Sequence, residues 1–184
     1  MSRRADDKSI IVALGGNLAA GGQGLRQSLG AALELLPGHG LRPTRCSRFW
    51  RSAAWPDPSE PAFLNAVALV ETALDPAQAM SALHRIEALF GRERSRPNAA
   101  RILDLDLIAY GRQVCAGDLV LPHPRAAERL FVMGPLAELA PGWTHPVSGK
   151  RAADLARDAA VGRDARPLPE EPGESLEGIK RFGR

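Results

Sequence analysis

The chain has 184 residues, the length of one ordinary domain, and its apolar fraction of 45% is enough to fill a core at that size. The 24 Lys and Arg residues against 21 Asp and Glu give a formal net charge of +3, which indicates a general affinity for anions and no particular partner. No stretch reaches the roughly 18 apolar residues of a membrane span, and the two cysteines lack a CxxC spacing, so we expect a cytoplasmic protein with reduced thiols and no membrane partner.

Hydrophobic patterning predicts alternating strands and helices over the first 110 residues. The predicted elements are, in chain order, a strand over 9–14, a helix over 25–36, strands over 41–52 and 63–73, a helix over 76–90 and a strand over 101–110. This order predicts an α+β protein with a ferredoxin-like βαββαβ core. We expect three layers, α/β/α, with strand and helical elements added at the C-terminal end.

The remainder of the chain has a less regular pattern. A turn at Gly117-Asp118 predicts a short strand within 114–121, and the stretch 126–139 is largely helical. From about residue 161 the chain is rich in Gly, Pro, Arg and Glu and has no apolar periodicity, which is typical of disorder. We therefore expect a single domain over 1–160, followed by a mostly disordered tail over 161–184.

The last predicted strand contains the sequence LDLDL at 103–107. Because side chains alternate between the two faces of a strand, Asp104 and Asp106 point to one side, about 7 Å apart, and the leucines face a core. Adjacent carboxylates repel each other unless a cation lies between them, and Mg²⁺ is commonly held by one or two carboxylates together with substrate phosphates. The alternative is a solvated acidic face on an edge strand, which is the commoner case for an isolated pair.

The stretch 91–101, just before these carboxylates, carries four arginines and a single acid. Taken alone it is either a solvated basic loop or a loop that binds phosphate. Arginines and metal ligands that converge on one strand end favour phosphoryl transfer, which depends on positioning and on neutralising charge. The arginines are Arg92, Arg94, Arg96 and Arg101.

Two polar residues elsewhere are candidates for ligand contacts. His123 lies in a Pro-His-Pro turn, where it is either an ordinary loop histidine or a donor to a phosphate oxygen. Asn65 interrupts a nearly continuous apolar strand, and a buried amide needs hydrogen-bond partners. It either bonds to local backbone or contacts the edge of a bound heterocycle, with Phe63 on the same strand face. Phe131 is by default a core residue.

With these residues in place, the sequence resembles the 6-hydroxymethyl-7,8-dihydropterin pyrophosphokinases of folate biosynthesis, in order, from Ile10 to about Pro146. Each matching piece is weak alone, and the ordered set is specific. The pieces are ALGGNL at 13–18, SRFWRS at 47–52 with the stretch 61–72, RILDLDLI at 101–108, LPHPR at 121–125 and ERLFVM at 128–133.

The resemblance implies a magnesium-dependent transferase that moves pyrophosphate from ATP to the pterin alcohol and releases AMP. Two Mg²⁺ ions would be held by Asp104 and Asp106. The residues implied to be catalytic are Arg92, Arg101, Asp104 and Asp106. Those implied to bind ATP are Arg92, Arg101, Leu107, His123 and Arg129. Those implied to bind the pterin are Ser52, Trp55, Phe63, Asn65, Asp104 and Phe131, with the two phenyl rings on either side of the heterocycle.

Two other interpretations keep part of this pattern. A general nucleotidyl- or phosphotransferase would use the same metals, but it would not need the set of Phe63, Asn65 and Phe131. A non-catalytic RNA-binding module would use the basic loop, but such sheets expose aromatic residues for base stacking. This chain has only five Phe, one Tyr and three Trp, so we expect no nucleic-acid partner. We also expect a monomer.

Overall fold

The computed structural model describes residues 8–18, 24–54, 57–91 and 102–169. The expected βαββαβ order and the ferredoxin-like α+β class are confirmed. The elements are β1 (Ile10–Gly16), α2 (Leu25–Leu35), η1 (Pro37–His39), β2 (Arg42–Cys46), β3 (Trp50–Ser52), β4 (Phe63–Glu71), α3 (Pro76–Leu89), β5 (Asp104–Tyr110), η2 (Ala126–Glu128), α4 (Leu130–Leu139), α5 (Ala152–Asp158) and β6 (Arg166–Pro167), where η marks a 3₁₀ turn.

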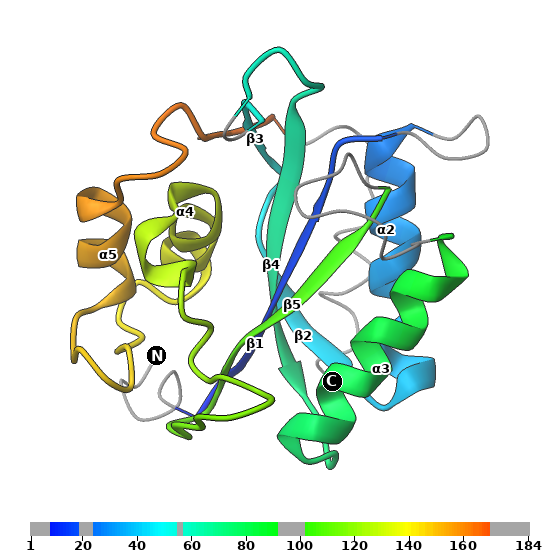
Figure 1. Cartoon of the computed structure of the whole chain (residues 1–184), viewed down its shortest axis with the longest axis vertical. Coiled ribbons are helices and arrows are strands. Elements are labelled where there is room, and N and C mark those ends of the chain that lie inside the picture. Colours follow the sequence, from blue (N-terminus) through cyan, green and yellow to red (C-terminus); the bar gives the residue numbers. More distant parts are fainter. Residues whose placement is uncertain (1–7, 19–23, 55–56, 92–101, 170–184) are drawn as a thin grey trace.

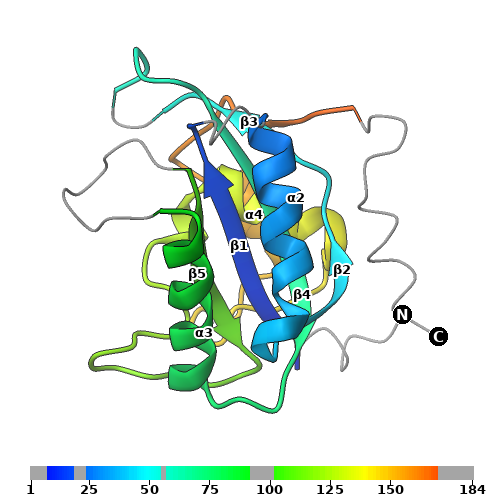
Figure 2. The ribbon, with the colours of Figure 1, turned by 90° about the vertical axis from the view of Figure 1, so that its right-hand side faces the viewer.

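One sheet forms the middle layer of the molecule. Its strand order is β5-β1-β4-β3-β6, and β2 also pairs with β4, with antiparallel neighbours throughout. Helices α2 and α3 cover one face, and α4 and α5 cover the other (Figures 1 and 2). The central strand β1 is therefore covered on both faces, which explains its continuous apolar sequence IIVAL.

The predicted strand over 41–52 is divided into β2 and β3, and local side chains explain the break. The backbone N–H of Arg48 donates to Glu138 Oε1 of α4 (2.9 Å) instead of to a neighbouring strand. The Ser47 hydroxyl accepts from the N–H of Val67 (3.0 Å), so a side chain replaces a backbone partner there. The partners of these bonds are distant in the sequence, so the apolar pattern of 41–52 gives no information about them and predicts one longer strand.

Helix α3 begins as its sequence indicates. The side chain of Asp75 accepts from the N–H of Gln78 (2.8 Å), and the Gln78 side chain accepts from the N–H of Asp75 (3.0 Å). This reciprocal pair is a capping box, and Pro76 occupies the first helical turn, where no N–H is needed.

In the C-terminal half, one expectation is corrected, one is confirmed and one further helix is found. The stretch 114–121 has only an isolated bridge between Cys115 and Leu121, because the intervening residues form a turn. The stretch 126–139 is largely helical, as predicted, with Arg129 in an extended conformation between η2 and α4. Helix α5 is an element that the apolar pattern does not predict.

The expectation of disorder from residue 161 is wrong for residues 161–169. Val161 exchanges backbone hydrogen bonds with Glu128 and Leu130, both at 2.9 Å, and β6 pairs with β3. This segment is held mainly by backbone bonds, which require no apolar periodicity, so its composition gives no sign of order. The predicted tail over 170–184 lies outside the described residues. Both cysteine thiols are free, and no helix among the described residues has the length and apolar character to cross a membrane.

Candidate active site

One end of the sheet face beneath α4 is hollow. The side chains of β1 on this face are Ile11, Ala13 and Gly15, so their size decreases along the strand. Ile11 packs in an apolar cluster with Trp143, and both side chains are fully buried. Ala13 and Gly15 instead line a pocket of about 290 Å³, which is near the lower end of the range for small-molecule sites, roughly 300–1,000 Å³.

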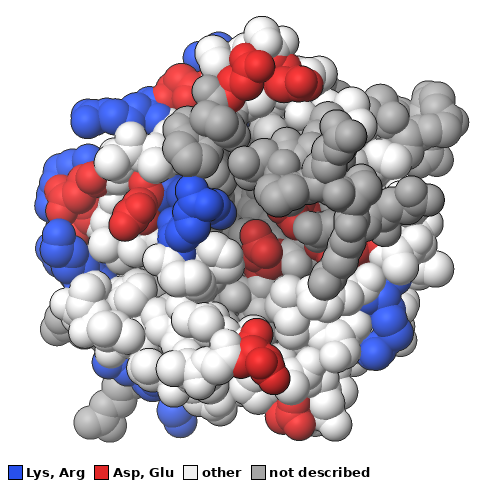
Figure 3. All heavy atoms as spheres, viewed as in Figure 1, with Lys and Arg blue, Asp and Glu red and all other residues white. Residues whose placement is uncertain are grey.

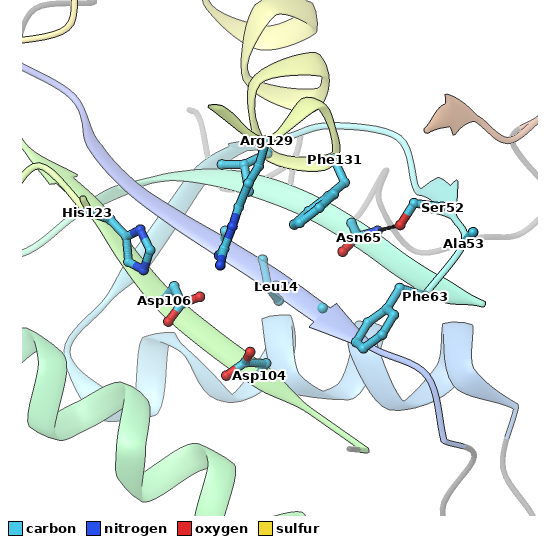
Figure 4. Close-up of a pocket in the computed structure, with 13 residues that line it drawn as sticks. Leu14, Ser52, Ala53, Phe63, Asn65, Asp104, Asp106, His123, Arg129 and Phe131 are labelled. Atoms are coloured by element: carbon cyan, nitrogen blue, oxygen red, sulfur yellow. Dashed lines mark hydrogen bonds between the residues drawn. The ribbon is translucent and has the colours of Figure 1, made fainter. Parts of the chain in front are cut away.

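The pocket brings together residues that are far apart in the sequence. Its floor is formed by β1, β4 and β5, and α4 with the turn before η2 forms the opposite wall (Figure 4). The predicted site residues that line it are Ser52, Phe63, Asn65, Asp104, Asp106, His123, Arg129 and Phe131.

Four of the predicted residues need separate mention. Trp55, Arg92 and Arg101 lie outside the described residues, so their roles stay predictions. Leu107 does not line the pocket, because its side chain is 2% exposed and packs in the core under α2 and α3. The buried side chain agrees with the alternation of the strand, and the implied role of Leu107 in ATP binding stays a prediction.

The carboxylate pair lies on β5 as the alternation predicts. Asp104 and Asp106 are half-buried and point into the pocket (Figure 4), whereas Leu103 and Leu105 are fully buried on the other face. The backbone N–H of Leu105, between the two acids, donates to Glu87 Oε1 of α3 at 2.7 Å.

Glu87 is therefore a residue of the site's support that the sequence reasoning missed. It is 2% exposed, and its carboxylate satisfies an N–H of β5, the edge strand. The sequence does contain a feature that could have indicated this: Glu87 follows Leu83 by four residues, so it places a charge on the apolar face of α3. A buried charge on such a face needs a specific partner.

His123 and Arg129 face the carboxylates from the other side of the pocket (Figure 4). Burial lowers the pKa of His123 below its ordinary value, and the charge of Arg129 lowers it further, while the carboxylates of Asp106 and Asp104 oppose the shift. The imidazole is therefore neutral near pH 7. Its Nδ1 accepts from the N–H of Arg125 at 3.3 Å, which leaves the proton on Nε2. His123 can thus donate one hydrogen bond from Nε2.

Asn65 is oriented by two bonds to β3. Its Nδ2 donates to the Ser52 hydroxyl at 3.1 Å and to the carbonyl of Trp50 at 3.5 Å. Its Oδ1 points the other way, toward the pocket (Figure 4). The side chain is only 6% exposed, so the amide presents a fixed acceptor to a ligand.

Two phenyl rings flank this amide. Phe63 projects from the start of β4 and Phe131 from the first turn of α4, with Asn65 between them in the close-up (Figure 4). The guanidinium of Arg129 lies 5.7 Å from the centre of the Phe131 ring, within cation–π distance. Phe131 is half-buried and lines the pocket, so its default interpretation as a core residue is incomplete.

The carboxylates of β5 and the two phenyl rings occupy opposite sides of one hollow. In the space-filling view, acidic atoms lie in a depression near the middle of the face, with basic atoms beside it (Figure 3). Across β1, Gly15 pairs with Asn65 on one side and with Asp104 on the other. Since neighbouring strands lie about 4.8 Å apart, the two sides are separated by roughly 10 Å.

A ferredoxin-like fold with a hollow of this size, lined by carboxylate, amide and aromatic side chains, defines a class of protein: an α+β protein with a built site for a small polar molecule. Residues 11–141 match the 7,8-dihydro-6-hydroxymethylpterin-pyrophosphokinase (HPPK) family. The chain belongs to this family.

Individual relatives agree with this assignment. A 2-amino-4-hydroxy-6-hydroxymethyldihydropteridine pyrophosphokinase from Synechocystis is 41% identical over 146 residues, which cover 79% of this chain and 73% of the relative. The enzyme of the same name from Methylorubrum extorquens is 41% identical over 113 residues, covering 61% of this chain and 72% of the relative.

The solved structures give the same fold. Plasmodium falciparum HPPK-DHPS, in a variant solved with pterin and p-hydroxybenzoate, superposes with a TM-score of 0.68 at 12% identity. The match covers 86% of this chain and 47% of that one, so this chain spans about half the length of the solved protein.

Proposed function

We propose that this pocket is the active site in which a pyrophosphoryl group passes from ATP to the hydroxymethyl group of a dihydropterin, with Mg²⁺ as the required cation. The activity follows from the family: the chain transfers pyrophosphate to 6-hydroxymethyl-7,8-dihydropterin, a step of folate synthesis. The donor, the cation and the residue roles are the proposed part.

The aromatic side of the pocket is proposed to bind the pterin. Phe63 and Phe131 would pack on the two faces of the flat ring, and Asn65 would accept a hydrogen bond from its edge through Oδ1. The bonds from Asn65 to Ser52 and Trp50 hold that acceptor in place before binding. A pocket of this kind disfavours analogues that leave its polar groups unpaired.

The opposite side is proposed to bind the triphosphate and two Mg²⁺ ions. Asp104 and Asp106 fit this cation, because they are half-buried carboxylates that point into one hollow from a single strand. The part of the chain that the structure describes contains no group of three or more candidate metal ligands, so phosphate oxygens and water would complete the shell. When bound, Mg²⁺ would neutralise phosphate charge at the β-phosphorus.

The transfer itself needs positioning more than covalent chemistry. The pterin hydroxymethyl oxygen attacks the β-phosphorus of ATP and loses its proton. The bond between the β-phosphorus and the oxygen that bridges it to the α-phosphorus breaks, and AMP leaves with that oxygen. Arg129 and the Nε2–H of His123 face the side where phosphate charge would lie. Arg92 and Arg101 remain predicted phosphate ligands.

One observation carries the proposal. Asn65 and Asp104 are paired across the same residue, Gly15, so the heterocycle side and the phosphate side are two strands apart. At roughly 10 Å, a single bound pterin can reach from the aromatic side to a phosphate held at the carboxylates.

The test is a product assay with the full chain, ATP, Mg²⁺ and 6-hydroxymethyl-7,8-dihydropterin. We expect AMP release that requires both the pterin and Mg²⁺ and that stops with a chelator. Pterin-dependent ADP would instead indicate transfer of a single phosphate. A folded protein without nucleotide turnover would contradict the proposal.

A further inference from the structure

Two elements at the sides of the pocket, α4 and β3, are joined by a segment that follows the part of the chain matched by the family. That match ends at residue 141. We call residues 159–169 the C-terminal strap. In Figure 1 this segment leaves α5, passes α4 and reaches β3. Its first part bonds to the residues at the start of α4 and its last part pairs with β3, so it connects two elements that are distant in the sequence.

The first half of the strap holds the beginning of α4. The N–H of Val161 donates to the carbonyl of Glu128, and its carbonyl accepts from the N–H of Leu130, both at 2.9 Å. The next residue, Gly162, lies directly against Phe131. A Cβ atom built at Gly162 would be 2.5 Å from Cδ1 of that ring and 3.1 Å from Cε1.

The second half of the strap holds β3 and the residues after it. The carboxylate of Asp164 accepts from the backbone N–H of Ala53, which lines the pocket next to Ser52. Strand β6 pairs with Trp50 and Arg51 of β3.

We propose that the strap positions the pterin side of the active site, with Gly162 setting the place of the Phe131 ring and Asp164 setting the place of the Ser52–Ala53 backbone. The inference rests on the proposed function for the identity of the ligand. Its physical basis is that both contacts end on groups of the pocket itself: a ring that lines it and an N–H beside a residue that orients Asn65. Both of these contacts end on the pterin side of the pocket, so a strap variant should affect pterin binding selectively.

Gly162→Ala tests the first contact, and Gly149→Ala is its matched control. The two glycines have φ values of 68° and 69°, so alanine strains both backbones alike. Only at Gly162 does the added Cβ meet a side chain; at Gly149 nothing lies within 4 Å. We expect both variants to lose stability through backbone strain, and Gly162→Ala to lose more because of the contact with the ring. We expect only Gly162→Ala to weaken pterin binding, by about tenfold or more, with ATP binding nearly unchanged. Equal pterin affinity in the two variants would overturn the inference.

A double variant separates positioning from general stability. If Gly162 acts through the ring, Gly162→Ala should cause no further loss of pterin affinity in a Phe131→Ala background. An undiminished loss in that background would show that Gly162 acts otherwise and would overturn its assigned role.

Asp164→Ala tests the second contact without any ligand. Hydrogen exchange of the Ala53 amide should become faster, because the carboxylate that accepts its bond is gone. The control is Asp118→Ala, at an exposed turn that does not line the pocket. Unchanged exchange at Ala53 would overturn the role of Asp164. Faster exchange in a protein that does not bind the pterin would support the strap and contradict the proposed function, so the two failures are distinguishable.

Discussion

The sheet face beneath α4 has two halves that are formed by the same strands: one is packed against helices, and the other lines the pocket. In the packed half, Ile11, Val67 and Ile108 are at most 2% exposed and lie in the cluster of Trp143. Two residues away from these on the same strands, toward the same end of the sheet, are Ala13, Asn65 and Asp106, and these line the pocket.

A displacement of two residues, about 7 Å along a strand, therefore separates residues that stabilise the fold from residues that form the site. In the packed half, large apolar side chains meet helix residues and exclude water. In the hollow half, a small or polar residue replaces the large one on every strand. The site is thus a part of the sheet face where smaller side chains leave a pocket. Substitutions in the hollow half should mainly affect activity, and those in the packed half should mainly affect stability.

The most severe loss of activity should come from the hollow half. Asp106→Ala should lower turnover by about 10²–10³-fold or more, because charge on the phosphates would lose a partner that acts in the transition state. Thermal stability should not fall, since the change relieves repulsion from Asp104. AMP release and thermal unfolding, compared with Asp118→Ala, provide the measurement. Turnover near that of the unchanged chain would contradict the two-carboxylate metal site.

The matching change in the packed half is Ile11→Ala. It removes a fully buried side chain and leaves a cavity next to Trp143, so the free energy of unfolding should fall by about 2–5 kcal/mol. Denaturant titration measures this loss. Turnover at a temperature where the variant is folded should stay near its original value. A large loss of turnover with little loss of stability would break the distinction between the two halves.

At the aromatic wall, Phe131→Ala should weaken pterin binding by about 10–100-fold, because one face of the ring loses its aromatic partner. ATP binding should change little, since Phe131 lies on the side away from the carboxylates (Figure 4). Equilibrium titrations with each ligand separately decide the matter. Equal losses for both ligands would indicate that Phe131 is only a packing residue.

A weaker effect is expected at Glu138, which joins α4 to the break between β2 and β3. Burial alone would raise the pKa of Glu138, but hydrogen bonds from the N–H and side chain of Arg48 and from the indole of Trp50 lower it below its usual value. The unfolded chain therefore takes up this proton more readily than the folded chain as the pH falls.

Its stabilising effect should thus be full above the usual pKa of about 4.3 and should be lost as the pH falls further, through the lowered value. Glu138→Gln should cost about 1 kcal/mol or less at pH 7, because the site is solvent-accessible. The difference between the two proteins should shrink in acid. Denaturant titrations at pH 7 and pH 3.5 measure it, and a difference that grows in acid would contradict the assigned sign.

Much of the site could be predicted before the fold was known, for reasons that are local. The alternation of LDLDL requires only that the segment be a strand, and Asn65 was distinctive because a polar residue interrupts an apolar strand. In the fold, the start of α3 is local in the same way, since the two residues of its capping box are three apart in the chain. Alternation also places the Leu107 side chain in the core, as found, whereas its ATP-binding role rests on the family resemblance and stays a prediction.

Periodicity and residues close together in the chain are enough to specify the order of elements in the βαββαβ core and the two faces of β5, and the ordered motifs indicate the family. They do not specify that Glu87 supports β5, that Glu138 divides β2 from β3, or that the C-terminal strap joins the walls of the pocket, and these features emerge only in the folded chain. The physical reason is that each of these contacts is a hydrogen bond to backbone N–H, which every residue except proline carries, so the pattern of side chains does not specify its partner.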